Sequence, residues 1–375
     1  MKKVLFIIPN LSHGGTNKCL ENILPFLCKS YDISIISLME EGIYKERFTP
    51  YNLFPLNIKF YKTKRNLFFR IINRLSNNIF LNILFKKHAI ITERKLQPDL
   101  VVAFQEGNAT LFTSHFTQRK IAWIHCDYKL YNEIFKPKIS KELKLFLKFE
   151  KIICVSNTTQ KSYNKYFPTL KQNTEYIYNI LNIEEIKKES KEIISDNIYT
   201  NTEFTLISVG RYHYVKQFEK IPSIVNEIIK LQKDIKLRWY IIGDGDSFIK
   251  KSITTEINKY NLQDKIICLG SKNNPYPYIK KANLLVVTSL SEAYPCVINE
   301  AKILKTPVLV SNFDSAHEIV DDNTGIIAPL NDFPKILYNI INDINGSYSC
   351  LKNKVNNYEF SNDENLDKLY KLFNT

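Results

Sequence analysis

The sequence contains no apolar stretch that approaches the roughly 18–20 residues needed to cross a bilayer. It begins with Met1-Lys2-Lys3 and the apolar residues 4–8, which imitate a signal peptide, but the apolar run stops at Pro9. A secretory core needs roughly 7–15 apolar residues followed by a small-residue cleavage site, and neither is found. We therefore interpret residues 4–8 as a buried strand and expect the protein to stay in the cytoplasm.

Paired cysteine motifs, linkers and repeats are also missing. The seven cysteines are scattered and form no C-x-x-C pair, which argues against a disulfide framework and against a zinc site. No Gly/Ser-rich or Pro-rich linker and no solenoid repeat is visible. The 44% of hydrophobic residues is typical of a globular protein, and a length of 375 residues favours two domains.

Acidic residues are in deficit, with 38 against 52 basic ones, so the formal charge is +14. The excess is concentrated between Lys59 and Lys95, where ten basic residues stand against a single acid, Glu93. Such a segment suits an anionic partner, whether phosphates, nucleic acid or an acidic membrane face.

Apolar residues in the same segment recur at helical spacing within residues 67–87, at Phe68, Ile72, Leu75, Ile79 and Ile83. One interpretation is a long helix packed on the N-terminal sheet. Another is a helix that rests on an anionic inner-membrane face, and the two are compatible. Only charge supports nucleic-acid binding, because no RNA-recognition motif, zinc finger or recognition helix is found. We therefore expect no nucleic-acid partner.

Short runs rich in Val and Ile alternate with helical patterns along the whole chain. The runs lack polar/apolar alternation, which is typical of strands buried on both faces of a parallel sheet, so the fold class is α/β. A polar stretch over residues 179–201 separates two series of strands. We predict two Rossmann-like domains, residues 1–180 and 181–355, whose parallel sheets face a central cleft. The expected strands are 4–8, 33–38, 100–104, 121–124 and 152–155, then 205–209, 238–242, 265–269, 284–288 and 308–310.

The segment richest in candidate catalytic and binding residues follows the expected strand 284–288 and contains Glu292, Pro295 and Glu300. Pro295 suits the first turn of a helix. Glu300, farther along that helix, is placed to accept hydrogen bonds from the two neighbouring hydroxyls of a ribose. The two glutamates would lie about 12 Å apart along a helix, beyond the roughly 5–9.5 Å of a glycosidase pair. The helix N-terminus predicts an anion site built from the backbone of Tyr294, Pro295, Cys296 and Val297.

A second cluster follows the expected strand 205–209 and consists of Gly210, Arg211 and Lys216. Gly210 permits an unusual turn, and the two cations project from the end of the strand toward the cleft. They would neutralise a leaving diphosphate without a metal ion, each contact contributing at most about 4 kcal/mol. Stabilisation of the leaving group by these cations would raise the reaction rate roughly 10²–10³-fold.

The order of these motifs resembles the family-4 retaining glycosyltransferases of the GT-B fold. That family has a strand ending in Gly-Arg, a lysine a few residues on and a G-x-G turn. A strand ending in Ser and an E-x7-E motif follow. The match is specific over residues 204–329 and weaker before them. The matching residues are Gly210-Arg211, Lys216, Gly243-Asp-Gly245, Ser289, Glu292, Glu300 and the closing turn Asn323-Thr-Gly325.

The resemblance implies that Arg211 and Lys216 hold a diphosphate, that Glu292 lies beside the donor sugar and that Glu300 binds the ribose. It also implies that the enzyme uses neither a metal ion nor a cofactor. Ala293 stands where the family usually has glycine. If the backbone there needs a positive φ to approach the sugar closely, alanine costs stability or alters the position of the donor sugar.

The Asp244-Gly-Asp246 sequence imitates a D-x-D metal motif but lies on the G-x-G turn. We therefore expect the two aspartates to stabilise this turn and not to bind a metal ion.

In the N-terminal half, Gly14-Gly15 resembles the family's loop near the donor phosphate, with Asn17 where many members have Glu. His125 follows the expected strand 121–124, where the family often has a histidine near the reaction centre. We expect Asp127 to orient His125 or an acceptor hydroxyl.

The sequence thus predicts a retaining glycosyltransferase that takes a sugar from a nucleotide diphosphate-sugar, with UDP the favoured carrier. The expected acceptor is a glycan or a lipid-linked glycan in bacterial surface-polysaccharide synthesis. A nucleotide-sugar epimerase of the same fold remains an alternative, and a basic nucleic-acid-binding protein has less support. The apolar residues Leu366, Leu369, Tyr370 and Phe373 predict a final amphipathic helix over residues 358–373. The resemblance implies that this last segment, residues 356–375, crosses back to the N-terminal domain.

Overall fold

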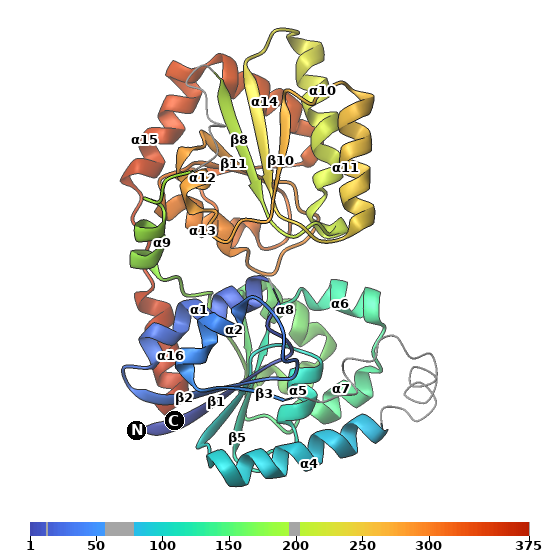
Figure 1. The fold of residues 1–375 in the computed structure, drawn as a ribbon, viewed down its shortest axis with the longest axis vertical. Helices are drawn as coiled ribbons and strands as arrows, with labels where there is room; N and C mark the ends of the chain where they lie inside the picture. The colour runs from blue at the N-terminus through green and yellow to red at the C-terminus, as the bar shows by residue number, and fades with distance from the viewer. Residues whose placement is uncertain (13, 57–78, 195–202, 375) are drawn as a thin grey trace. The chain divides into compact units, whose positions relative to one another are not determined.

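The computed structural model describes residues 1–12, 14–56, 79–194 and 203–374. They form two compact units, the first made of Met1–Leu181 and Asn362–Thr375 and the second of Asn182–Ser361 (Figure 1). The sequence analysis placed this division after residue 180 and the return of the chain at residue 356. Among the described residues, no helix has both the length and the apolar character that a membrane span requires.

The first unit is built on a seven-stranded parallel sheet in the order β3-β2-β1-β4-β5-β6-β7. Its helices are α1 (Gly15–Leu27), α2 (Tyr44–Phe48), α4 (Ile79–Leu96), α5 (Asn108–Thr113), α6 (Tyr128–Phe135), α7 (Ile139–Phe146), α8 (Asn157–Tyr166) and α16 (Asp363–Asn374). Its strands are β1 (Lys2–Ile8), β2 (Tyr31–Ser37), β3 (Leu53–Pro55), β4 (Leu100–Ala103), β5 (Arg119–Ile124), β6 (Lys151–Cys154) and β7 (Thr174–Tyr176).

The second unit contains a six-stranded parallel sheet in the order β10-β9-β8-β11-β12-β13. In Figure 1, α10 and α11 lie along one side of this sheet and α12 and α13 along the other. Its helices are α9 (Ile183–Glu189), α10 (Ile221–Leu231), α11 (Ser247–Lys259), α12 (Tyr276–Lys281), α13 (Cys296–Ile303), α14 (Phe333–Asn342) and α15 (Ser349–Asn357). Its strands are β8 (Phe204–Val209), β9 (Leu237–Ile242), β10 (Ile266–Gly270), β11 (Leu284–Val287), β12 (Val308–Ser311) and β13 (Gly325–Ala328).

Both sheets therefore have the Rossmann strand order 3-2-1-4-5-6 when each is numbered from its own first strand, and the first sheet adds β7. The order reverses between β1 and β4 in the first unit and between β8 and β11 in the second. Loops that leave the carboxyl ends of parallel strands diverge at such a switch point, and ligands bind there. The predicted α/β class with two parallel-sheet domains is confirmed.

All ten expected strands are present, and no strand end is shifted by more than two residues. The sequence analysis missed β3, β7 and β13, each three or four residues long. Two of them, β3 and β7, are the edges of the first sheet, and β13 is an edge of the second. Edge strands carry shorter apolar runs than the buried central strands, so they give a weaker sequence signal.

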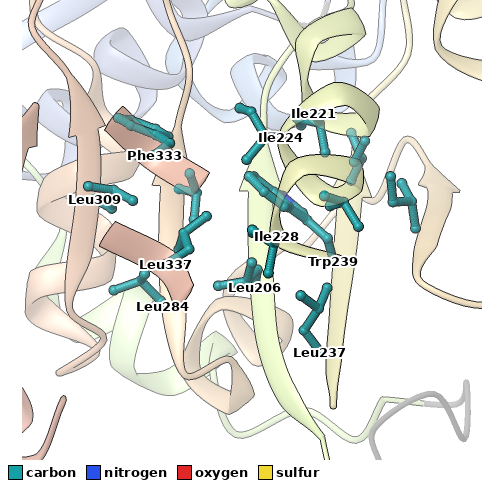
Figure 2. Close-up of a cluster of buried hydrophobic side chains, with 14 of the residues drawn as sticks. Leu206, Ile221, Ile224, Ile228, Leu237, Trp239, Leu284, Leu309, Phe333 and Leu337 are labelled. Carbon is teal, nitrogen blue, oxygen red and sulfur yellow. The ribbon is translucent and has the colours of Figure 1, made fainter. Parts of the chain in front are cut away.

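The core of the second unit lies between its sheet and the helices α10, α11 and α14. Figure 2 shows Leu206 and Trp239 from the sheet facing Ile224 and Ile228 of α10. The indole N–H of Trp239 donates to Ser208 Oγ at 3.0 Å. Ser208 in turn donates to the Val286 carbonyl at 2.6 Å, so these buried polar groups are satisfied and fix neighbouring strands.

The last helix, α16, packs on the first unit. Phe373 contacts the rings of Phe6 and Tyr31, and Lys2 Nζ donates to the Phe373 carbonyl at 2.7 Å. Arg119 donates to the Leu372 carbonyl at 2.9 Å. Cations at the carbonyl end of a helix favour this arrangement.

The predicted helix over residues 358–373 begins only at Asp363, because the chain just before it is tied down. Tyr358 is the C-cap of α15, and its carbonyl accepts a hydrogen bond from Lys305. Asn362 exchanges two hydrogen bonds with the backbone of Leu181, at 3.1 and 2.7 Å. These anchors hold residues between the two helices in an extended path.

The basic segment is only partly described. The predicted positions Phe68, Ile72 and Leu75, and the basic residues up to position 74, lie outside the described residues. In α4, Ile83 is 62% exposed, which does not fit the interpretation in which this apolar face packs on the N-terminal sheet. Phe85 and Ala89 are buried instead.

Candidate functional site

The carboxyl ends of β8 and β11 are neighbours at the switch point of the second unit, and side chains from the loops after them meet there. Lys216 forms an ion pair with the Glu292 carboxylate, although 76 residues separate the two in the sequence. Their side chains are 23% and 13% exposed. The sequence analysis named both residues without predicting their contact.

Hydrogen bonds fix both partners of this pair. Ser289 Oγ donates to Glu292 Oε1 at 2.6 Å, and Ser315 Oγ donates to the Glu292 carbonyl at 2.8 Å. Thr288 Oγ1 donates to the Lys216 carbonyl at 2.7 Å. A lysine ammonium has three N–H donors, so Lys216 can keep its bond to Glu292 and still donate to an anion. Ser315 was not predicted, since a lone serine in a turn carries no distinctive pattern.

Arg211 lies on the same loop as Lys216, and both side chains run along glycine backbone. A Cβ added to Gly210 would lie 3.4 Å from Lys216 Cε, so the lysine stem passes over this residue. A Cβ on Gly245 would lie 2.9 Å from Arg211 Cγ. The Arg211 residue itself is exposed, which leaves its guanidinium accessible to a ligand.

The turn after β9 braces the Arg211 loop. Tyr212 N–H donates to the Asp244 carbonyl at 3.0 Å, and Asp246 N–H donates back to the Tyr212 carbonyl at 2.9 Å. Gly243 has φ of +150°, and a Cβ there would lie 1.9 Å from the Gly210 carbonyl oxygen. Glycine is therefore required at position 243, and its role is to seat the loop that carries Arg211.

The two acidic residues of the D-x-D imitation take part in local turn contacts. Asp244 accepts from Gly245 N–H at 2.9 Å, and Asp246 caps α11 by accepting from Phe248 N–H at 2.8 Å. Lys250 lies 3.5 Å from Asp244. Within the described ranges, no cluster of three or more His, Cys, Asp or Glu side chains is arranged to hold a metal ion.

The helix that follows Glu292, α13, begins at Cys296. Pro295 is its N-cap, with φ −72° and ψ 113°, so it lies one position before the first turn in which the sequence placed it. No side chain caps the helix at this end, and its N-terminus carries the positive end of the helix dipole. Tyr294 accepts a hydrogen bond from Asn299 at 3.2 Å, and burial raises the pKa of Tyr294. Val297 and Cys296 are half-buried.

Glu300 lies in the second turn of α13 and is 6% exposed. The Tyr276 hydroxyl, at the start of α12, donates to Glu300 Oε1 at 3.5 Å. The sequence analysis did not identify Tyr276, because its helix follows a loop without a motif. The structure thus places Glu300 on the same loop-and-helix element as Glu292, eight positions along.

In the first unit, Gly14 caps α1 and Gly15 begins it. A Cβ on either glycine would meet no atom within 4 Å, so packing inside the protein does not demand glycine here. Asn17 braces the loop before them, donating to the carbonyls of Asn10 and Ser12 at 3.1 and 2.8 Å. Glycines that face open space at a helix N-terminus suit the close approach of an anionic ligand.

His125 follows β5, and its side chain is sheltered. Its Nε2 atom is buried and meets no hydrogen-bond partner within the described part of the chain. The ring lies 4.8 Å from that of Phe104, and burial lowers the pKa of His125 to about 3. The imidazole is therefore neutral at pH 7, with a polar atom left for a ligand.

Glu106, at the end of β4, is a site residue that the sequence analysis missed. Its carboxylate accepts the His125 backbone N–H at 2.9 Å and a hydrogen bond from the Cys126 thiol. Burial raises the pKa of Glu106. Asp127, expected to orient His125, caps α6 by accepting from Lys129 N–H at 3.0 Å and also accepts from Ser162 at 3.2 Å. Glu106 thus fixes the backbone at His125.

Comparison with known proteins places these residues in context. The profile of the family described as Glycosyl transferases group 1 matches residues 189–343. An uncharacterized glycosyltransferase of Methanocaldococcus jannaschii is 26% identical over 58% of this chain, and the match covers 56% of that protein.

A second relative matches over most of its length. The N-acetylgalactosamine-N,N'-diacetylbacillosaminyl-diphospho-undecaprenol 4-alpha-N-acetylgalactosaminyltransferase of Campylobacter jejuni is 24% identical over 87% of this chain and 86% of its own. Among solved structures, HepE of Anabaena in complex with UDP and glucose has a TM-score of 0.77 at 15% identity, with 100% of both chains covered.

Proposed function

We propose that this chain, a group 1 glycosyltransferase of the GT-B fold, moves a sugar from a nucleotide diphosphate-sugar with retention of configuration. We propose UDP as the carrier and a glycan or a lipid-linked glycan of bacterial surface-polysaccharide synthesis as the acceptor. The observation that carries the proposal is the Lys216–Glu292 pair at the switch point of the second unit. In this pair, Lys216 is the cation proposed for the diphosphate and Glu292 is the carboxylate proposed to lie beside the sugar.

Two relatives support the choice of substrates. The HepE structure holds UDP and glucose. The Campylobacter jejuni relative is named for an acceptor on diphospho-undecaprenol. A lipid-linked acceptor of this kind also fits the basic character of this chain.

The proposed reaction replaces one bond to the anomeric carbon by another on the same face. The acceptor hydroxyl oxygen forms a bond to the anomeric carbon while the bond between that carbon and the phosphate oxygen of the donor breaks. The electron pair of the broken bond stays on the departing diphosphate. The acceptor proton passes to the leaving oxygen. Arg211 and Lys216 stabilise the developing charge, each by at most about 4 kcal/mol at an effective dielectric near 20. In this scheme the cationic side chains of the protein neutralise the leaving diphosphate, which a metal ion does in other glycosyltransferases.

Thermal stabilisation by a panel of nucleotide sugars tests the donor, and product analysis with candidate acceptors tests transfer. We expect one UDP-sugar to raise the melting temperature and to be consumed only when an acceptor is present. The product should keep the donor's anomeric configuration. Formation of an epimer without acceptor would favour the epimerase alternative instead, and stabilisation by no nucleotide sugar would contradict the proposal.

We also propose that α4 rests on an anionic membrane surface. Its outer side exposes Ile83 and Ile91, at 62% and 51%, beside the exposed Lys86, Lys87 and Arg94. Exposed isoleucines suit the boundary between headgroups and acyl chains, and each basic side chain near an anionic surface adds about 1 kcal/mol of attraction.

Co-sedimentation with lipid vesicles separates this surface from a nucleic-acid site. We expect binding to vesicles rich in anionic lipid at low salt, weaker binding at high salt, and further weakening by Lys87→Glu. Equal binding to neutral vesicles would contradict an electrostatic contact. A salt-dependent gel shift with RNA and no vesicle binding would favour the nucleic-acid alternative.

A further inference from the structure

His213 lies in the loop after β8, between the two cations assigned to the diphosphate, Arg211 and Lys216. It is half-buried and precedes a short 3-10 turn, Tyr214–Lys216. No motif of the sequence analysis gave it a role. Its position alone puts a titratable side chain at the edge of the sheet where the anion is expected.

The orientation of the ring leaves one nitrogen for a ligand. His213 Nδ1 accepts a hydrogen bond from Val215 N–H at 3.4 Å, and the ring packs 4.6 Å from that of Tyr214. Because Nδ1 accepts, the neutral ring carries its proton on Nε2. Nε2 is the donor on the side of the ring away from the turn.

Four charged groups, which come from three segments of the second unit, act on His213. Arg211 and Lys216 come from its own loop, Asp246 from the N-cap of α11 and Glu292 from the loop after β11. Burial lowers the pKa of His213, and the two cations lower it further, while the two carboxylates act in the opposite direction. The ring is therefore neutral at pH 7 while no anion is bound.

We propose that His213 is a third ligand of the donor diphosphate and takes up a proton when the nucleotide binds. This inference rests on the proposed function, because it requires the diphosphate to lie at Arg211 and Lys216. A bound diphosphate places negative charge beside the ring, which reverses the effect of the two cations. The empty site thus avoids a third like charge, and the occupied site gains a third cation.

The direction of the pH dependence follows. Because the pKa of His213 is higher in the complex than in the free protein, nucleotide affinity rises as pH falls through the interval between the two values. Each unit of difference strengthens binding up to about tenfold. UDP itself titrates near pH 6, so only the difference between two protein variants isolates the contribution of His213.

The test is calorimetric titration with UDP at pH 6 to 8, in buffers of different ionisation enthalpy, which counts the protons taken up on binding. Wild type is compared with His213→Asn, since asparagine also caps a turn but does not titrate. The control is His88→Asn, a histidine of α4 in the first unit. We expect wild type and the control to take up on the order of half a proton more than His213→Asn near pH 6.5, and to gain up to tenfold in relative affinity from pH 8 to 6.

Equal proton uptake and a constant affinity ratio across this range would overturn the role of His213 while leaving the proposed donor intact. Failure of wild type to bind UDP would overturn the proposed carrier, and this inference with it. His213→Lys provides a second variant in case His213→Asn unfolds. Its fixed charge should give tight binding with the proton uptake of His213→Asn rather than that of wild type, and uptake equal to that of wild type would also contradict the proposal.

Discussion

Replacing Gly243 by alanine tests whether the glycine turn seats the Arg211 loop. The added Cβ would lie 1.9 Å from the Gly210 carbonyl oxygen, whereas real Cβ contacts are no shorter than 3.0 Å. The φ of +150° is a further strain for any residue with a side chain. Backbone strain of this kind costs about 1–3 kcal/mol, and the clash forces the loop to move by about 1 Å. Such a displacement of a positioned group costs roughly 10²-fold in rate.

Urea unfolding and transfer assays measure the two effects of Gly243→Ala separately. We expect the free energy of unfolding to fall by about 2–4 kcal/mol and turnover to fall by roughly 10²-fold in protein that is still folded. Gly14→Ala is the control for stability, because its Cβ meets no atom within 4 Å and its φ is 174°. A Gly243→Ala protein with the stability and turnover of wild type would refute the bracing role of this turn.

Two further substitutions test other parts of the chain. Gly15→Ala should leave the free energy of unfolding unchanged or raise it by up to about 1 kcal/mol, but weaken UDP-sugar binding in a titration; unchanged binding would argue against a ligand at this loop. Lys302→Met should stabilise the protein at pH 7, since burial lowers the pKa of Lys302 from 10.5 to about 8. Its charge in the folded state costs up to about 3 kcal/mol there, partly offset by its 2.6 Å bond to the Ile319 carbonyl. Between about pH 8 and 10.5 only the unfolded chain binds this proton, so wild type should gain stability relative to Lys302→Met as pH rises; urea unfolding at pH 7 and 9.5 that gives equal differences would contradict this.

The central strands could be predicted because they are buried on both faces and their sequences are continuous apolar runs. The edge strand β7, Thr174–Tyr176, has no such run and was missed. The side of α4 that packs could not be read from the sequence, because helical spacing defines an apolar face but does not show whether that face is buried. In the structure Phe85 is buried and Ile83 is exposed.

The residues of the candidate site were found more easily than their contacts. Lys216 and Glu292 stand at strand ends, which local patterns reveal. Their ion pair depends on β8 lying beside β11, a pairing between distant segments that no local pattern contains. Glu106 follows the expected strand 100–104, so an acidic residue at a strand end was the available signal. Its contact with His125 again depends on strand order, here β4 beside β5.

The most direct test of the account is the transfer rate of Lys216→Ala at saturating donor and acceptor. Removing this cation should lower turnover by roughly 10²–10³-fold with little change in the urea midpoint. Lys220→Ala, an exposed lysine four positions on, should keep the wild-type rate. Turnover of Lys216→Ala equal to that of wild type would contradict the claim that this side chain stabilises the leaving diphosphate.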